Sequence, residues 1–438
     1  MSETALNAMA KQYEEMTLCK SRYDDIDIQW YTEGPFWRRT DMRYSREYKI
    51  LPDYEIADAK HGRTLRDILD ESTHLLDNLA LYKKTARPEE IHRVNYLIDH
   101  VGHVRTRTRM LLGEKIPFDT MTDELYSLVA PDYDYKKFDD ILAELGQALP
   151  GAGSAQEKAW AFREKISIPK DRVLRVLKET TQVFHDISMR RMTLTGNSMP
   201  RVRVREYADP GMAFLSILFG YDYNHLEYER NFNLNFPWTV DNVVECIGHE
   251  MEPGHITYYE KRTQTFIDTC WPEMAVVSQF SSSSAFTEGS ARYVIPMCFD
   301  LSMEKQLDFE RETIFKNAGL DTGLVELMPL WHKYVEIAGY AKLEVTRNLW
   351  ENRWSEAEAA AFLKKYAVIG KDAEDSCVSR LAADDGHFVA HDYARDVVKD
   401  YFNAVAPTVD EQWRLYESLC CADMSMREIQ DKTFRIDF

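Results

Sequence analysis

The stretch 230-RNFNLNFPWTVDNVVECIGHEMEPGH-255 passes from a strand pattern into a helix pattern and ends in a segment with two histidines. Polar and apolar residues alternate over 230–236, which is typical of a half-buried strand. Pro237 ends that pattern, and Thr239 is the candidate N-cap of the helix that follows. The sequence therefore predicts a strand that leads directly into a helix carrying the His-Glu pair at 249–250.

A small antiparallel sheet is predicted around this strand, over about 201–236. The same alternation occurs in 201-RVRVREY-207, and the apolar stretch 213-AFLSILFG-220 lies between the two alternating segments. A strand followed by a metal-binding helix is the order found in zinc peptidases of the zincin type, where the edge of the strand pairs with an extended substrate. We therefore expect the second alternating strand to hold a substrate backbone, with Asn233 and Asn235 as substrate-binding residues.

The His-Glu pair indicates a catalytic zinc site, in which histidine and carboxylate supply three ligands and the ion lowers the pKa of a water. His249 is the candidate first ligand, and Glu250 is the candidate base that takes the proton of the water. His255 comes six residues after His249, so a regular helix would turn the two side chains about 120° apart. Pro253 lacks an N–H and Gly254 permits a sharp turn, so we predict a helix break that brings His255 back.

The third ligand in such sites is usually a carboxylate on a following helix. Glu288 in 284-SAFTEGSARYVI-295 is the candidate, because the segment has helical spacing and starts after a run of serines that can cap it. We expect the metal helices to cover about 239–295 and to hold one zinc ion, with another divalent metal as the alternative.

Composition limits the class of protein. The chain has 438 residues and a formal charge of −19, and a negative surface repels polyanions, so neither nucleic acid nor a membrane is expected as a partner. The first residues lack the features of a signal peptide, and no apolar run is long enough for a membrane span. Seven cysteines without a C-x-x-C pair indicate a reducing compartment. We expect a soluble, cytoplasmic protein, and the oligomeric state stays open.

Most of the chain has the spacing of helices, so the predicted fold is mainly α, a large helical zincin-like domain with the small sheet beside the metal helix. Segments 61–84 and 88–114 place apolar residues three and four apart. The break 147-QALPGAGSAQ-156 is rich in small residues, and we predict that it separates an N-terminal helical region, 1–146, from a metal-binding catalytic region, 157–438.

Two pairs of histidines with helical spacing lie outside the motif. His100 and His103 stand one turn apart beside several arginines, and we interpret them as part of a solvated helix face. His387 and His391 recur with Arg395 at four-residue spacing, so we expect them on one helix face. His391 is a candidate proton shuttle and His387 a candidate substrate-binding residue, while a second metal site or histidines with a structural role are the alternatives.

The motifs resemble those of the domain-of-unknown-function 885 family, metallopeptidase-like proteins with the patterns H-E-A-x-P-G-H-H-x-Q and E-G-W-A-x-Y. This chain has H-E-M-E-P-G-H-I-T-Y at 249–258 and E-G-S-A-R-Y at 288–293. The stretches 202–211 and 354–363 are similar to two further segments of the family, and the resemblance covers about 200–400. It implies a mostly α fold, Glu250 as base, and zinc bound by three residues, His249, His255 and Glu288.

A later segment, 387-HFVAHDYARD-396, falls where the family has P-G-Q-A-x-x-Y-K-x-G. The resemblance implies that Tyr393 is the donor that stabilises an oxyanion. The chain departs from the family at Glu252, Ser290 and Arg292, where aromatic or apolar residues are usual. These changes indicate a small polar or charged substrate, with Glu252 and Arg292 as substrate-binding residues.

The sequence thus predicts a zinc-dependent hydrolase that cleaves an amide or peptide bond in a peptide or a small polar amide. One alternative is a specialised metalloenzyme for a small polar metabolite, either a biosynthetic or catabolic C–N hydrolase or a non-hydrolytic iron or manganese enzyme. A metal-free interaction scaffold is the remaining alternative.

Overall fold

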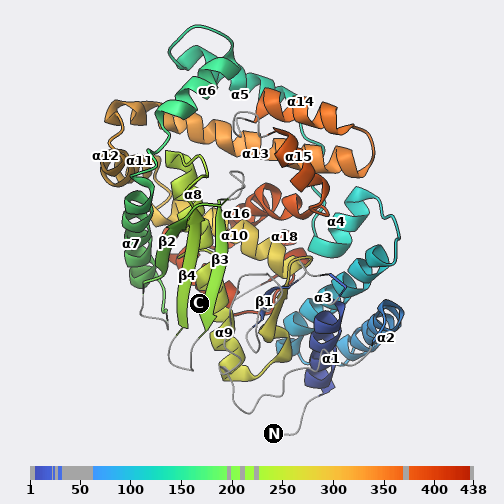
Figure 1. Ribbon diagram of the computed structural model, residues 1–438. Helices are drawn as coiled ribbons and strands as arrows, with labels where there is room; N and C mark the ends of the chain where they lie inside the picture. The colour runs from blue at the N-terminus through green and yellow to red at the C-terminus, as the bar shows by residue number, and fades with distance from the viewer. Residues whose placement is uncertain are drawn as a thin grey trace.

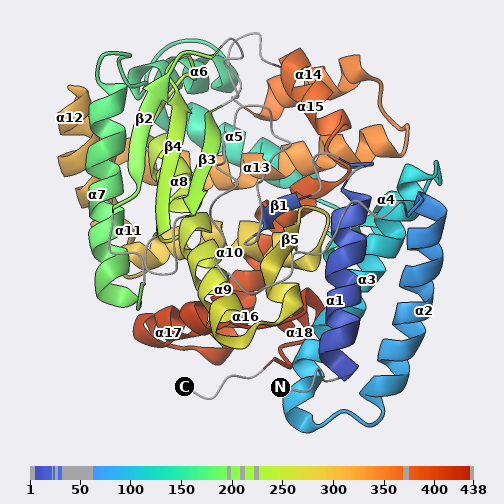
Figure 2. The ribbon, with the colours of Figure 1, turned by 60° about the horizontal axis from the view of Figure 1, so that its bottom comes forward.

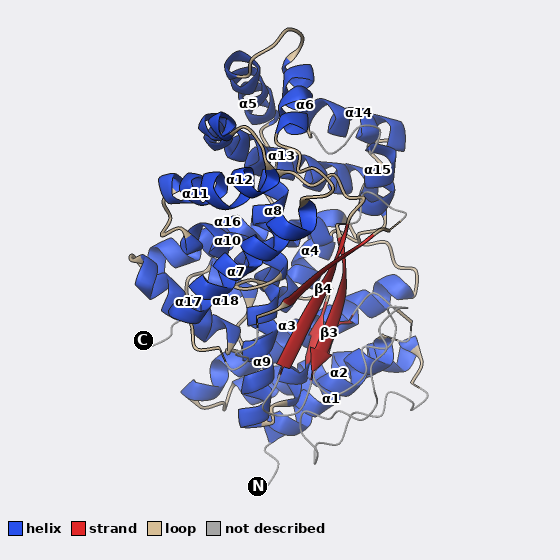
Figure 3. Cartoon of the chain, turned by 60° about the vertical axis from the view of Figure 1, so that its left-hand side comes forward, coloured by secondary structure: helices blue, strands red, loops and turns tan. Residues whose placement is uncertain are grey.

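The computed structural model describes residues 5–21, 23–24, 28–31, 63–194, 199–207, 213–220, 226–367 and 374–434. The fold is mainly α, as predicted, and strands β3 and β4 of a small sheet lie at one side of the helices (Figure 3). Within these described ranges, no helix is both long enough and apolar enough to cross a membrane.

The N-terminal helices pack into a layer of their own at one side of the molecule (Figure 2). They are α1 (Ala5–Lys20), α2 (Leu65–Lys83) and α3 (Ile91–Leu111). Strand β1 (Ile28–Tyr31) pairs antiparallel with β5 (Val276–Ser278), which directly precedes α10 in the chain. The predicted helices at 61–84 and 88–114 are confirmed as α2 and α3, apart from 61–62, which lie outside the described residues.

The remaining helices surround α10, which lies near the centre of the molecule (Figure 1). Four helices, α8, α9, α10 and α16, contribute to the candidate site, and the others enclose them. The bounds are α4 (Phe118–Tyr126), α5 (Tyr135–Ala148), α6 (Ala155–Lys165), α7 (Val173–Arg191), α8 (Val240–Glu250), α9 (His255–Thr269), α10 (Ser282–Cys298), α11 (Met303–Phe309), α12 (Lys316–Ala318), α13 (Met328–Trp350), α14 (Glu356–Tyr366), α15 (Glu374–Ala382), α16 (Asp392–Val405), α17 (Val409–Cys420) and α18 (Met426–Gln430).

The predicted break at 147–156 is the connection between α5 and α6, which pack against each other. Leu145 before it, Leu149 within it and Phe162 after it belong to the same large hydrophobic core. The division into two regions stays a prediction, and the structure adds that both sides of the break contribute to one core.

The three-stranded sheet differs from its prediction in direction and order. It consists of β2 (Arg201–Arg205), β3 (Phe214–Gly220) and β4 (Leu226–Asn233) in the order β2-β4-β3. The pair β3–β4 is antiparallel, but β2 runs parallel to β4, so the prediction of an antiparallel sheet is wrong for one of its two pairs. Residues 234–236 lie beyond the end of β4.

Strand β4 is the middle strand, which contradicts the prediction that it offers a free edge to a substrate. β3 pairs with β4 over 226–232, and β2 pairs with it over 229–233. Over 230–232, both edges of the alternating segment are therefore occupied by the protein itself. Alternation reports which faces of a strand are buried, and it carries no information on which strand occupies each edge.

The close approach of α10 and α16 depends on a glycine. A Cβ atom at Gly289 would lie 2.6 Å from the carbonyl carbon and 2.8 Å from the carbonyl oxygen of Ala394. Because those atoms belong to the backbone, the clash could be removed only if the two helices moved apart. Gly289 follows the candidate ligand Glu288, so this packing also sets the position of that ligand.

We predict that Gly289→Ala lowers the free energy of unfolding by about 1–3 kcal/mol, since it overpacks the contact between α10 and α16. The matched control is Gly102→Ala in α3, where a Cβ meets nothing within 4 Å. That change should leave stability equal or raise it by up to about 1 kcal/mol. Urea denaturation of both variants measures the difference, and equal stabilities would contradict the packing argument.

Candidate metal centre

The two candidate histidines lie on either side of a break between α8 and α9. Helix α8 ends at Glu250, and α9 begins at His255. A Cβ atom at Gly254 would lie 2.0 Å from the carbonyl oxygen of His249, so only glycine fits there. The hydroxyl of Tyr416 donates to the carbonyl of Pro253 at 2.7 Å and holds the connecting segment. The predicted helix break is confirmed.

The break brings the three candidate ligands together. His249 Nε2 lies 3.0 Å from Glu288 Oε2, and His255 Nε2 lies 3.5 Å from Glu288 Oε1. The two imidazole centroids are 4.4 Å apart, and one ligand atom from each of the three residues lies within 4.8 Å of the others. All three residues are buried.

This donor set fits a divalent metal ion. Glu288 Oε2 and the Nδ1 atoms of His249 and His255 are buried without a hydrogen-bond partner. Unpaired buried polar atoms are costly, and an ion bound at the cluster would compensate for that cost at Glu288 Oε2. Two imidazoles and one carboxylate are a ligand set found at catalytic zinc, and also at non-haem Fe(II).

The charges of the cluster support one another. Burial raises the pKa of Glu288, but the attraction of His255 and hydrogen bonds from His249 and His255 outweigh that effect and hold the pKa well below its usual value. Burial lowers the pKa of His249, and the interactions with Glu288 and Glu250 outweigh it, so the pKa is raised. Glu288 is therefore a carboxylate at neutral pH, as a metal ligand must be.

Glu250 is held by an arginine that sequence reasoning missed. Arg230 on β4 lies with its Nη2 3.0 Å from Glu250 Oε2, and it also donates to the backbone carbonyl of Glu250. Glu250 Oε1 lies 3.6 Å from His249 Nε2, so the carboxylate stands between the arginine and the candidate ligand. Strand β4 thus positions the candidate base. The sequence signal that could have identified Arg230 is its place in the strand that precedes the helix with the His-Glu pair.

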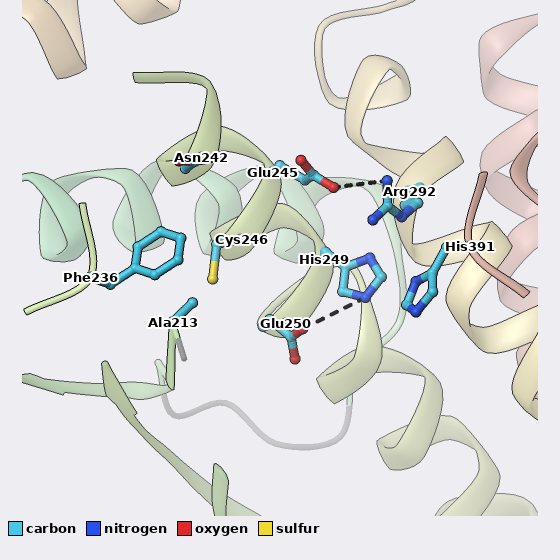
Figure 4. Close-up of a pocket in the computed structure, with 9 residues that line it drawn as sticks. All are labelled: Ala213, Phe236, Asn242, Glu245, Cys246, His249, Glu250, Arg292 and His391. Carbon is cyan, nitrogen blue, oxygen red and sulfur yellow. Dashed lines mark ion pairs between the residues drawn. The ribbon is translucent and has the colours of Figure 1, made fainter. Parts of the chain in front are cut away.

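The cavity at the site has a volume of about 170 Å³ and opens between the end of α8, α10 and the turn before α16 (Figure 4). Four of the predicted site residues line it, together with neighbours that the prediction did not include. The lining residues are Ala213, Phe236, Asn242, Glu245, Cys246, His249, Glu250, Arg292 and His391.

His391 faces the cluster, with its Nδ1 3.3 Å from Glu288 Oε2. Burial holds its pKa well below the usual value, so the imidazole is neutral. His387 instead lies 3.0 Å from the hydroxyl of Ser284, and it does not line the cavity. The prediction of one shared helix face is wrong, because a short 3₁₀ turn, His387–Ala390, ends before α16 begins.

Three other predicted site residues lie away from the cavity. Tyr393 is half-buried, and the acidic groups that raise its pKa in addition to burial are Asp396 and Asp400. Asn233 accepts hydrogen bonds from the N–H groups of Tyr207 and Asn235, and Asn235 donates back to Tyr207. The asparagines thus join the ends of β2 and β4, and the oxyanion role of Tyr393 stays a prediction.

Glu252 is occupied within the protein. It is 2% exposed, and its Oε2 lies 2.5 Å from Nδ1 of His185 on α7. Burial raises the pKa of Glu252, and the hydrogen bond with Glu252 raises the pKa of His185. This contradicts the prediction that Glu252 contacts substrate: its acidic side chain pairs with a histidine that lies 67 positions away in the sequence.

The first histidine pair is buried, so the prediction of a solvated helix face is wrong. His100 Nε2 lies 2.7 Å from the hydroxyl of Ser283, and His103 Nε2 accepts the backbone N–H of Ser282 at 3.1 Å. Burial is the main cause that lowers the pKa of both histidines. The helical pattern of α3 did not show this, because the partners lie about 180 residues later. These contacts anchor the start of α10 to the N-terminal layer.

No family model and no curated protein matches the chain. Among solved structures, the chain is similar to the putative lipoprotein from Colwellia psychrerythraea, with a TM-score of 0.53 and 12% sequence identity. The match covers 84% of this chain and 69% of the other. At this identity the likeness concerns the fold alone, and the resemblance to the domain-of-unknown-function 885 family stays a prediction.

We predict that Gly254→Ala reduces zinc affinity about tenfold or more, because the added methyl group forces His249 away from its position against Gly254. Titration of the metal-free protein with zinc measures the affinity, and circular dichroism checks that the helices remain. Gly102→Ala is again the control and should bind zinc like the wild type. Unchanged zinc affinity in Gly254→Ala would show that the break does not set the ligand geometry.

Proposed function

We propose that this protein is a metal-dependent hydrolase, with zinc as the ion, that cleaves an amide or peptide bond. The observation that carries the proposal is the buried cluster of His249, His255 and Glu288 beside a cavity that is lined by His249 and by the carboxylate of Glu250. A ligand set alone would fit several chemistries. A carboxylate that is not a ligand, placed beside the set, is what hydrolysis requires of a base.

His249, His255 and Glu288 would hold the ion, which supplies Lewis acidity that polarises a carbonyl and lowers the pKa of a water. The other steps belong to side chains of the protein. Glu250 takes a proton from the attacking water, a bond forms between the oxygen of the water and the carbonyl carbon, and the C–N bond breaks. Glu250 then gives the proton to the leaving amine, so that the products are an acid and an amine.

Two neighbours support that role. Arg230 contacts both the carboxylate and the backbone carbonyl of Glu250. The base is therefore oriented before the reaction starts, and no side-chain freedom has to be lost during the reaction. His391 is neutral, and its place at the cavity beside Glu288 suits an N–H donor to the substrate oxygen that gains charge. His391 thus replaces Tyr393 as the better-placed candidate for that donor.

The alternative is a specialised metalloenzyme for a small polar metabolite. Two observations favour it over a peptidase with a long groove. The cavity of about 170 Å³ is smaller than the usual range for drug-sized ligands, and the central position of β4 removes the predicted peptide edge. The ligand set also fits iron, so elemental analysis of protein purified without added metal distinguishes a hydrolase from a redox enzyme.

We predict that Glu250→Gln retains zinc and loses about 10²- to 10⁴-fold in the rate of amide hydrolysis, since the base is removed and the ligands are kept. His255→Ala should lose both zinc and activity. The measurements are zinc content by elemental analysis and release of amine from a mixture of short peptides and small amides.

Glu252→Gln is the matched control, because it makes the same change two residues away on a side chain that does not line the cavity. It should retain hydrolysis, with thermal unfolding recorded to separate stability from catalysis. The proposal fails if the zinc-loaded wild type cleaves no amide, or if Glu250→Gln is as active as the wild type.

A further inference from the structure

Arg292 stands beside the candidate metal centre without belonging to it. It lies four residues after Glu288 on α10, and residues at that spacing occupy the same helix face, with Cβ atoms about 5–6 Å apart. Arg292 also lines the cavity with Glu250 and His391. Figure 4 shows its guanidinium on the side of the cavity where the rings of His249 and His391 lie.

The contacts of Arg292 use only one end of the guanidinium. Its Nη1 lies 2.9 Å from Glu245 Oε1 and 3.2 Å from Asp392 Oδ1. Nε is buried without a hydrogen-bond partner, and Nη2 has no hydrogen-bond partner within the described part of the chain. An arginine whose other N–H groups are unpaired in an enclosed place can gain a strong interaction from an added acceptor.

The two carboxylates at Nη1 leave Nε and Nη2 of Arg292 unpaired among the described residues. Asp392 Oδ1 also lies 3.3 Å from Nη1 of Arg395, and Arg395 has two further acids of its own, Asp396 at 2.9 Å and Glu336 at 3.4 Å. The side chain of Glu245 is 35% exposed, so solvent weakens its attraction for the guanidinium. The other acid in the cavity, Glu250, is already paired with Arg230. Because the guanidinium is charged, its unpaired N–H groups favour an anionic acceptor over an uncharged one.

We propose that Arg292 binds a carboxylate of the substrate next to the reacting amide. This rests on the proposed function and gives it a substrate class: small amides with a free carboxylate close to the C–N bond that is cleaved. Only one helical turn separates Glu288 from Arg292, so the carboxylate of the substrate would lie close to the C–N bond that is cleaved. The small cavity limits the size of the substrate. A carboxylate has two acceptor oxygens that suit the planar N–H groups of arginine.

Two pairs of probes test the proposal and show which half of the amide carries the carboxylate. N-acetylglycine has it on the amine half, and its uncharged counterpart is N-acetylglycinamide. Succinamic acid has it on the acyl half, and its counterpart is succinamide. The zinc-loaded wild type should cleave at least one of the two acids with a kcat/KM about tenfold or more above that of its counterpart.

Variants connect that preference to Arg292. Arg292→Gln should reduce the ratio between acid and counterpart to about one, and Arg292→Lys, which keeps the charge opposite Glu245 and Asp392, should give an intermediate ratio. Arg395→Gln is the matched control: it removes the other arginine at Asp392, does not line the cavity, and should keep the wild-type ratio. Thermal unfolding of each variant confirms that it is folded.

Calorimetric titration of the two acids into zinc-loaded Glu250→Gln and into Glu250→Gln/Arg292→Gln separates this proposal from the proposed function. Binding that needs Arg292, without hydrolysis of any amide by the wild type, supports the carboxylate site and rejects the hydrolase. Hydrolysis with equal rates for acids and counterparts, or a preference that survives in Arg292→Gln, rejects the carboxylate site and leaves the hydrolase. Absence of both binding and preference also rejects the carboxylate site.

Discussion

The candidate metal centre depends on the contact between the backbone of Gly254 and the carbonyl oxygen of His249. In one continuous helix, His249 and His255 would point in directions about 120° apart. Because glycine allows the chain to lie against that oxygen, α8 can end and α9 can begin within a few residues. Both imidazoles then face Glu288, and Glu250 remains at the end of α8 beside them.

The same break gives two nearby carboxylates different environments. Glu250 is the last residue of α8, lines the cavity and pairs with Arg230 from the sheet. Glu252 lies in the connecting segment, where it is buried against His185 of α7. One of these acids is therefore available for chemistry, and the other holds the segment to the neighbouring helix. Residue type alone does not separate the two roles, since the difference arises from where the helix ends.

Local patterns predicted the features that depend on neighbouring residues. The helix break followed from Pro253 and Gly254, the mainly α fold followed from periodicity, and the grouping of His249, His255 and Glu288 followed from ligand chemistry and spacing. Features set by distant partners were missed. The burial of His100 depends on a serine 183 residues away, and the pairing of β2 with β4 depends on a strand order that alternation does not report.

The contacts between α3 and the start of α10 have a consequence for how the chain matures during synthesis. His100 and His103 leave the ribosome long before Ser282 and Ser283, the residues that they bind. The α10 helix that carries Glu288 also packs on α16, which is made later still. Contacts of such long range form late, because loop closure must come first. A metal ion bound at the candidate centre, as we propose, would therefore be acquired by a nearly complete chain, and its binding would select finished molecules over partly folded ones.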